Sequence, residues 1–253
     1  MPVDGMSSIS TFMRPMMLKM QVVANNLANI NSSGFKKGQL FIEVLQNQDP
    51  QLNDGSQVGE FFPGVRISEA SDFSQGVLEQ TNNPFDFAID GPGFFAVETG
   101  EGVRFTRAGN FSVAPTGELI TKNGYTLLGE NDGAIILPNV QNLAKEDVAV
   151  SPLGDVLVQG VHIGKMKLVT FENVNDELVK IGTSLFHQKE DSEVIAVDSD
   201  RTFVRQGFLE GSNVDGIDEM IQMIELTRQF ESGQRIIQST DESVNRSLEI
   251  GRF

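Results

Sequence analysis

The two histidines are the side chains of this chain best suited to bind a metal ion or to transfer protons near neutral pH. Each of them, His162 and His187, lies beside apolar residues in a predicted strand, with no second nitrogen or sulfur ligand at helical spacing. A zinc site needs about three or four such ligands, and the chain contains no cysteine. We therefore expect both histidines to be structural, and we expect no metal and no cofactor.

Pairs of acidic residues are the second candidate, because paired carboxylates bind calcium or act as the acid and base of a glycosidase. Asp198 lies close to Asp200, and Glu190 is followed by Asp191. Neither pair has the spacing of an EF-hand loop, and the chain has one Tyr and no Trp to form a platform for a sugar ring. We interpret this acidic segment as a solvated loop.

A serine nucleophile or a phosphate-binding glycine loop would need a particular local context. Ser151 and Ser184 lack the Gly-x-Ser-x-Gly context of a nucleophile elbow. Gly91-Pro92-Gly93 resembles part of a dinucleotide loop, but a predicted strand at 94–97 follows it, so there is no helix N-terminus to bind a pyrophosphate. The sequence predicts no enzyme. The alternative class is a β-domain enzyme or a carbohydrate-binding module with coiled-coil termini.

Apolar stripes in the two terminal segments are the strongest regularity of the chain. The first stripe alternates steps of 3 and 4 residues, which makes sense on a short helix only if another helix covers it. The second recurs at roughly helical spacing from a capping residue, Asn213 or Asp215, to about Glu249. We expect both stripes to be shielded from water only by neighbouring copies or related subunits. They comprise Met6, Ile9, Met13, Met16, Met20, Val23, Leu27 and Ile30, and then Ile217, Met220, Met223, Ile224, Phe230, Ile237, Val244 and Leu248.

Two features refine the N-terminal helix. Pro15 lies inside the stripe, where it removes a backbone donor, so we expect the helix to kink there or to begin there. Asparagine is a poor helix former, yet three asparagines occur near the end of this helix. Asn25 and Asn29, four positions apart, share a face, and we expect them to form hydrogen bonds across a helix–helix contact and fix its register.

The charge distribution limits the partners. The chain has a formal net charge of −16, which argues against nucleic acid and against an anionic membrane surface. Residues 1–40 carry one acid against four bases, whereas residues 211–253 carry eight acids against four bases. Opposite charges on the two ends favour pairing them with each other or with neighbours.

Two kinds of targeting segment are not predicted. No apolar run approaches the ~20 residues of a membrane helix, so we expect no direct membrane insertion. The N-terminal segment lacks the basic, apolar and small-residue regions of a cleavable signal peptide.

The middle of the chain is predicted to be β. The segments 94–97 and 103–106 form a predicted hairpin, and Asn123-Gly124 predicts a second hairpin turn. Short strands with turn signals about every ten residues are typical of an antiparallel barrel or sandwich. We therefore expect an α+β fold of three parts. They are a helical assembly domain of residues 1–35 plus 212–253 that pairs as a coiled-coil-like core, a linker or extended segment 36–71, and a β domain 72–211.

Several short motifs carry a resemblance to a known family. These motifs resemble the signatures of bacterial flagellar rod and hook proteins. They follow one another in the family's order and span nearly the whole sequence. The motifs are Ala24-Asn25-Asn26-Leu27-Ala28-Asn29, Gly34-Phe35-Lys36, Ala88-Ile89-Asp90-Gly91-Pro92-Gly93-Phe94-Phe95, Phe105-Thr106-Arg107-Ala108-Gly109-Asn110-Phe111, Gly117-Glu118-Leu119 and Gly207-Phe208-Leu209-Glu210-Gly211-Ser212-Asn213-Val214.

The resemblance implies a structural subunit of the flagellar basal-body rod, exported unfolded by the flagellar type III apparatus into the rod that spans the periplasm. Its partners would be copies of itself and the other proximal and distal rod subunits. The terminal helices would form the assembly interface, with the β domain outside. The implied interface residues are Met13, Met16, Met20, Val23, Asn25, Asn26, Leu27, Ala28, Asn29, Ile30, Phe35, Ile217, Met220, Ile221, Met223, Ile224, Phe230, Ile237, Val244 and Leu248.

Two features resemble the proximal-rod member of the family. The stretch between Gly34-Phe35-Lys36 and the β domain is short, and the C-terminal segment contains Arg228-Gln229-Phe230-Glu231. We therefore expect a proximal-rod subunit, with the distal-rod subunit as the alternative.

Overall fold

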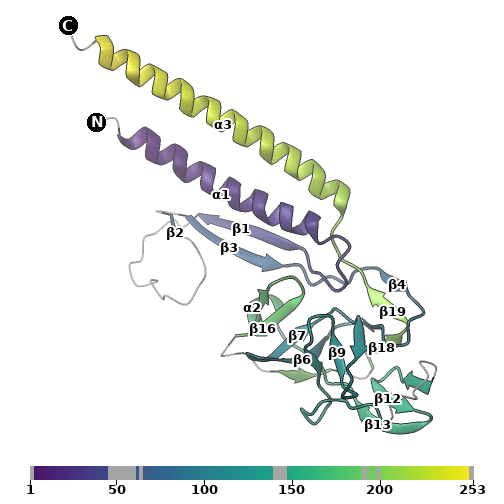
Figure 1. Cartoon of the computed structure of the whole chain (residues 1–253). Helices are drawn as coiled ribbons and strands as arrows, with labels where there is room; N and C mark the ends of the chain where they lie inside the picture. Colours follow the sequence, from purple (N-terminus) through teal and green to yellow (C-terminus); the bar gives the residue numbers. More distant parts are fainter. Residues whose placement is uncertain are drawn as a thin grey trace. The chain divides into compact units, whose positions relative to one another are not determined.

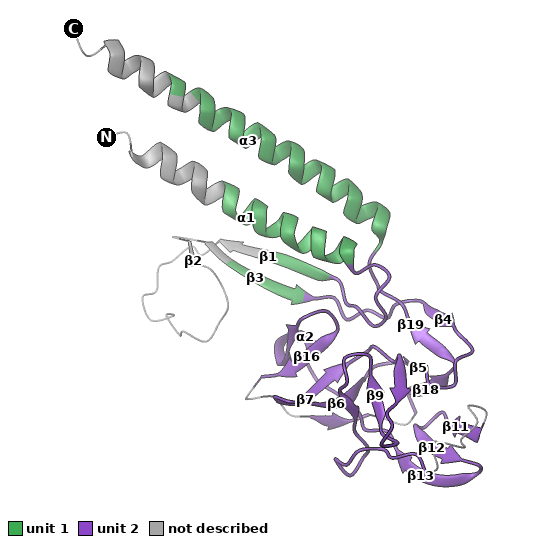
Figure 2. Cartoon of the chain, in the orientation of Figure 1, with its two compact units in different colours: residues 1–28, 38–70, 215–253 green, residues 29–37, 71–214 purple. Residues whose placement is uncertain are grey.

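The structure is a computed structural model of the whole chain, and its parts form two compact units (Figure 2). Unit 1 comprises Met1–Ala28, Gly38–Ala70 and Asp215–Phe253, and unit 2 comprises Asn29–Lys37 and Ser71–Val214. The residues that the structure describes are 3–44, 61–62, 65–138, 147–189, 192, 194–197 and 200–250.

Unit 1 is built on two long helices that lie side by side, α1 (Val3–Ala28) and α3 (Gly216–Ile250) (Figure 1). Helix α1 continues through Pro15, so the expectation that it begins there is wrong. Helix α3 is capped by Asp215, whose Oδ1 accepts hydrogen bonds from the backbone N–H groups of Ile217 (2.9 Å) and Asp218 (3.3 Å).

A small sheet in unit 1 lies within the residues that the sequence predicts as a linker, 36–71. Its strand order is β1-β3-β2, with β1 at Gly38–Val44, β3 at Val65–Ser71 and β2 at Phe61–Phe62. The β1 sequence alternates around Leu40, Ile42 and Val44, and such alternation suits a strand with one covered face. Strand β1 contacts α1. Residues 45–60 and 63–64 of the predicted linker lie outside the described residues.

Unit 2 consists mainly of antiparallel strands. A nine-stranded sheet has the order β15-β16-β7-β6-β10-β9-β8, with β14 pairing with both β6 and β17. Smaller sheets are β11-β12-β13, β18-β5 and β19-β4. The bounds are β4 Leu78–Gln80, β5 Phe87–Asp90, β6 Phe94–Thr99, β7 Gly102–Thr106, β8 Phe111–Val113, β9 Leu119–Thr121, β10 Thr126–Leu127, β11 Val148–Val150, β12 Asp155–Val158, β13 Val161–Lys165, β14 Leu168–Thr170, α2 Val174–Glu177, β15 Leu178–Ile181, β16 Leu185–Gln188, β17 Ile195–Ala196, β18 Phe203–Gln206 and β19 Phe208–Glu210.

The hairpins predicted from local turn signals are present. Strands β6 and β7 pair, and β9 and β10 pair around Asn123-Gly124. The pairing of β12 with β13 shifts in register between Val156, which pairs with Gly164, and Leu157, which pairs with His162, as at a β-bulge. Residues 203–210 form two strands, β18 and β19, that divide at Gly207, whose φ of +77° suits glycine.

Strand β6 explains how unit 2 fills its interior. Phe95 and Val97 on one face of β6 belong to one buried apolar cluster, and Phe94 and Ala96 on the other face belong to a second. Because alternate side chains of a strand point to opposite faces, a strand buried on both faces reads as a continuous apolar run. Phe94 also packs edge-on against Phe186, with ring centroids 5.7 Å apart. Unit 2 therefore has a complete apolar interior of its own.

Candidate assembly site

The two long helices of unit 1 pack against each other along part of the predicted stripes. Met16, Val23 and Leu226 form a buried cluster, and Met20, Met223 and Phe230 pack against it partly buried. The expectation that only other subunits shield the stripes is therefore wrong for these residues. The chain covers part of each stripe with its own opposite helix.

Asn26 is the asparagine that fixes the contact between these elements. Its side chain is 1% exposed, and it forms a pair of hydrogen bonds with Gly38 at the start of β1: Nδ2 donates to the carbonyl oxygen (2.9 Å), and Oδ1 accepts from the backbone N–H (2.8 Å). Asn26 Nδ2 also donates to Glu219 Oε2 on α3 (3.2 Å). One buried amide thus joins α1, β1 and α3, and a misaligned helix would leave it unsatisfied.

Asn25 and Asn29 are less buried than Asn26. Asn25 is exposed and Asn29 is half-buried, and the Oδ1 atom of Asn29 accepts a hydrogen bond from the Ser32 hydroxyl (3.2 Å). The residue that fixes the register is the neighbour, Asn26. Helical spacing groups Asn25 with Asn29, but the sequence gives no sign of which side of α1 faces α3 and β1.

A second apolar face of α3 is exposed. Ile217, Met220, Ile221 and Ile224 are 68%, 48%, 51% and 53% exposed, and we call these four residues the α3 stripe. At about 100° per residue, they fall within one sector of the helix, on the side opposite Leu226. Contiguous exposed apolar side chains of this size mark interaction surfaces.

The other predicted interface residues differ in how far they are buried. Met13, Leu27, Ile30 and Ile237 are half-buried, and Ala28 is exposed. The side chains of Val244 and Leu248 lie outside the described residues. Phe35 is fully buried within unit 2, with Lys180 Nζ 3.7 Å from its ring centroid. Phe35 therefore presents no surface to another subunit, and its place in the predicted interface is corrected.

A buried ionic cluster in unit 2 brings together motifs that are far apart in sequence. Glu210 is fully buried, and Lys36 Nζ donates to its Oε1 (2.6 Å) while Arg107 Nη1 donates to its Oε2 (3.0 Å). The backbone N–H of Gly76 donates to the same Oε1 (3.0 Å), and Arg107 Nη2 donates to the carbonyl oxygen of Gly91 (2.8 Å). The hydrogen bonds compensate the carboxylate for the loss of water.

Burial lowers the pKa values of the two cations in this cluster. Desolvation lowers the pKa of Lys36, although the charge and the hydrogen bond of Glu210 act in the opposite direction. Desolvation likewise lowers the pKa of Arg107, again opposed by Glu210. Both cations depend on this one carboxylate, so its removal would leave two buried charges without their counter-ion.

Glycines allow the segments around the cluster to approach closely. Gly34 has φ +66°, and a Cβ atom added there would lie 2.2 Å from the backbone N of Ala108. A Cβ atom on Gly109 would lie 1.5 Å from the carbonyl oxygen of Phe87. The motifs Gly34-Phe35-Lys36 and Arg107-Ala108-Gly109 therefore pack backbone to backbone, and sequence reasoning did not connect them.

Asn213 has a different role from the predicted helix cap. Its Oδ1 accepts from the backbone N–H of Lys37 (2.8 Å), and its Nδ2 donates to the carbonyl oxygen of Asp72 (2.8 Å). The backbone N–H of Asp72 in turn donates to the carbonyl oxygen of Lys37 (2.8 Å). The Asn213 side chain therefore joins three segments of unit 2 that are distant in sequence.

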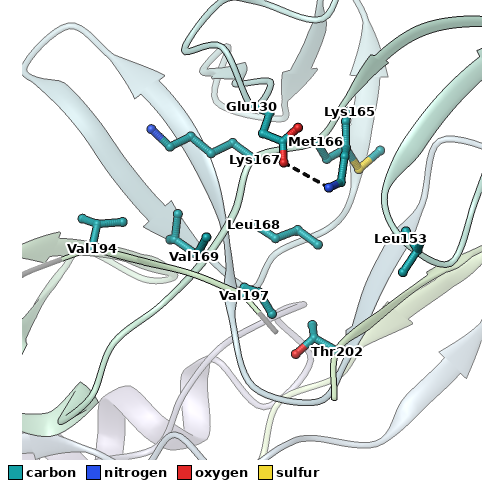
Figure 3. Close-up of a pocket in the computed structure, with 11 residues that line it drawn as sticks. Glu130, Leu153, Lys165, Met166, Lys167, Leu168, Val169, Val194, Val197 and Thr202 are labelled. Atoms are coloured by element: carbon teal, nitrogen blue, oxygen red, sulfur yellow. Dashed lines mark hydrogen bonds and ion pairs between the residues drawn. The ribbon is translucent and has the colours of Figure 1, made fainter. Parts of the chain in front are cut away.

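A pocket in unit 2 is lined mainly by apolar side chains. Its volume is about 300 Å³, and its lining side chains include Leu168, Val169 and Val197 (Figure 3). Lys165 Nζ pairs with Glu130 Oε1 at 3.0 Å, and the Thr202 hydroxyl donates to the carbonyl oxygen of Pro92 (2.7 Å). The lining therefore contains no nucleophile beside a base.

Among the described residues, neither histidine belongs to a group of side chains that could bind a metal ion. His162 Nε2 lies 3.5 Å from Asp155 Oδ1 at the surface, and His187 is on β16. Across the part of the chain that the structure describes, no three His, Asp or Glu side chains are grouped to hold a metal ion. In the same described residues, no helix combines the length and the apolar character needed to cross a bilayer.

Comparison with known families matches two segments of the chain. Residues 88–158 match the model described as the flagellar hook protein FlgE/F/G D1 domain. Residues 205–250 match the model described as the flagellar basal body rod FlgEFG protein C-terminal region. The first match covers the centre of unit 2, and the second covers the end of unit 2 and α3.

Relatives resemble the chain over nearly its whole length. The flagellar basal-body rod protein FlgG of Bacillus subtilis is 32% identical, over 99% of this chain and 97% of the relative. The flagellar basal-body rod protein FlgF of Caulobacter vibrioides is 31% identical, over 91% of each. FlgG of Borreliella burgdorferi is 32% identical, over 87% of this chain and 88% of the relative. The chain therefore belongs to the family of flagellar basal-body rod proteins, which are structural proteins and not enzymes.

Proposed function

We propose that this chain is a rod subunit that polymerises through α1 and α3. In each subunit, the two helices pair side by side as in a coiled coil. The observation that carries the proposal is the exposed α3 stripe, which lies beside a contact that the chain makes with itself. Full burial of a large aliphatic side chain contributes about 1.5–3 kcal/mol. Covering four half-exposed ones therefore contributes on the order of 4 kcal/mol to each subunit contact.

The shape of unit 1 supports assembly through the helices. The buried cluster of α1 and α3 is small, and the apolar surface of the α3 stripe is left over after the two helices have paired. A long helix with apolar residues on two sides is typically covered on both sides in the assembled state. Neighbouring subunits supply the second cover in this proposal.

The position in the rod that we propose is the proximal one. The short segment between Gly34-Phe35-Lys36 and the β domain and the run Arg228-Gln229-Phe230-Glu231 support it. Relatives named FlgG and FlgF match at similar identity, and the distal rod is the alternative. We further propose export through the flagellar type III apparatus and a place in the rod that spans the periplasm. Locating the chain in a map of an isolated basal body distinguishes the two positions.

The test of polymerisation is an aspartate in the α3 stripe with a matched control outside it. Ile221→Asp places a charge on the stripe, whereas Ile236→Asp makes the same change at a residue of similar exposure, 55%, on another side of α3. We expect Ile221→Asp to reduce incorporation into rods about tenfold or more, with thermal unfolding of the free monomer unchanged. Ile236→Asp should be incorporated into rods at nearly the level of the unaltered chain. Equal incorporation of the two variants would contradict the proposal.

A further inference from the structure

We propose that Asn29–Lys37 is a strap that leaves its site on unit 2 and returns to it as one piece, while the rest of unit 2 stays folded. The site accepts a glycine–aromatic–lysine segment, and the strap occupies it within the same chain. The proposed rod function does not depend on this inference. We call the residues that bind the strap by hydrogen bonds the cradle: Ser74, Lys180, Glu210 and Asn213.

The strap is attached to the cradle mainly through polar groups. Lys36 Nζ donates to Glu210 Oε1 and to the carbonyl oxygen of Ser74, at 2.6 Å in both cases. The backbone N–H of Gly34 donates to the carbonyl oxygen of Glu210 (2.8 Å). Lys180 Nζ donates to the carbonyl oxygen of Lys36 (2.8 Å). Buried polar and ionic contacts contribute little net free energy, because each group first loses its hydration.

The one fully buried aromatic ring of the strap lies outside the apolar interior of unit 2. Phe35 is 0% exposed, and Lys180 Nζ is 3.7 Å from its ring centroid. Phe35 belongs to neither apolar cluster, and all members of the two clusters lie between Phe73 and Val204 in the sequence. The departure of the strap therefore removes no side chain from either cluster.

The cradle keeps a balanced ion pair without the strap. Arg107 Nη1 donates to Glu210 Oε2 (3.0 Å), and the backbone N–H of Gly76 donates to Oε1 (3.0 Å). Lys36 is the additional cation, so its departure leaves a carboxylate that is still paired with a guanidinium. Breaking a buried pair is costly when one charge is left uncompensated. That penalty does not oppose the release of the strap.

The strap is distant in sequence from the cradle. Lys36 is 38 positions from Ser74 and 174 from Glu210, and Lys37 is 176 positions from Asn213. The hairpin of β6 and β7, by contrast, pairs residues that are neighbours in sequence. Distant contacts require the closure of long loops, whereas local contacts form early. We therefore expect the strap to dock onto strands that have already paired.

Docking of the strap changes how the two units are connected along the chain. The chain passes between the units after residues 28, 37, 70 and 214. The first two crossings flank the strap, which continues into α1 at one end and into β1 at the other. With the strap undocked, unit 2 is connected to unit 1 through the crossings after residues 70 and 214 alone. The strap is thus a releasable attachment of α1 and β1 to unit 2.

Amide hydrogen exchange of the full chain, in urea below the unfolding transition, tests the proposal. The strap reporters are the N–H groups of Gly34 and Lys37, which both donate to the cradle. The interior reporter is the N–H of Leu128, which donates to the carbonyl oxygen of Ala96 on β6 (2.9 Å). We expect protection factors at least about tenfold lower for the strap reporters than for the interior reporter. Their urea dependence should be weaker, because undocking exposes less surface than unfolding does.

A variant that opposes docking sharpens the test. Lys36→Asp puts a second carboxylate beside Glu210 in place of its cation. We expect the amides of Gly34 and Lys37 to lose nearly all their protection, while Leu128 stays protected by about a hundredfold or more. Lys165→Asp makes the same change at a more exposed ion pair of unit 2, and it should leave the strap reporters protected.

Three results would overturn the proposal. The first is one shared urea dependence for Gly34, Lys37 and Leu128 in the unaltered chain, because the strap would then open only with the whole of unit 2. The second is exchange of Gly34 and Lys37 by separate openings, because the strap would then not move as one piece. The third is the loss of protection at Leu128 in Lys36→Asp, because unit 2 would then need the strap to stay folded.

Discussion

Unit 1 and unit 2 use their apolar residues in opposite ways. Unit 2 buries two large clusters around β6 and encloses a carboxylate between two cations. In the described part of unit 1, one small cluster is buried and the α3 stripe is about half exposed or more. Unit 2 therefore has a large apolar interior of its own, whereas the helices of unit 1 leave a contiguous apolar face exposed.

The largest expected effect is a loss of stability of unit 2. Glu210→Ala leaves the charges of Lys36 and Arg107 buried without a counter-ion, and breaking a buried pair in this way costs about 3–5 kcal/mol. We expect the free energy of unfolding of unit 2, measured by denaturant titration, to fall by that amount. Glu130→Ala, which removes an exposed partner of Lys165, should cost about 0–1 kcal/mol. Similar losses of unfolding free energy in both variants would show that the buried Glu210 cluster stabilises unit 2 no more than an exposed ion pair does.

A smaller effect is expected in unit 1. Asn26→Ala removes the hydrogen bonds to Gly38 and Glu219 and leaves buried backbone groups unsatisfied, which costs about 1–3 kcal/mol. Amide hydrogen exchange at Gly38 should become faster, because its N–H loses the acceptor Asn26 Oδ1. Asn25→Ala, at an exposed position of the same helix, is the control and should leave this amide protected. Unchanged exchange at Gly38 in Asn26→Ala would contradict the proposed clamp.

The smallest expected effect concerns a surface carboxyl of unit 2. The Ser151 hydroxyl donates to Asp155 Oδ2 (2.7 Å) and, as the largest cause, lowers the pKa of Asp155 below its usual 3.8. A carboxyl with a lowered pKa in the folded state stabilises the fold above its ordinary pKa, and this contribution is lost as the pH falls through the folded pKa. Ser151→Ala should raise the pKa of Asp155 in an NMR titration. An unaltered titration would assign the shift to His162 and Lys165 instead.

Local signals were sufficient for much of the fold. Period-two alternation and an Asn-Gly turn identify the hairpins of unit 2, and the capping residue Asp215 marks the start of α3. Pro15 misled the interpretation, because its local penalty is outweighed by the packing of Met13 and Met16, on either side of it, against α3.

The candidate site was only partly predictable, because its partners are distant in sequence. Glu210 is 174 positions from Lys36 and 103 from Arg107, and no periodicity connects them. A helical stripe shows that a face is apolar but not what covers it. Hence Met223 and Ile224, neighbours in one stripe, have different surroundings: Met223 packs against α1, and Ile224 is exposed.

The central claim is that the α3 stripe is exposed in the free chain and covered in the rod. Maleimide labelling of Ile221→Cys tests this directly, because the chain has no other cysteine, with Ile236→Cys as the exposed control. We predict rapid labelling at both positions in the free monomer and, in isolated rods, strong protection at 221 relative to 236. Equal labelling of Ile221→Cys in the monomer and in the rod would contradict the account.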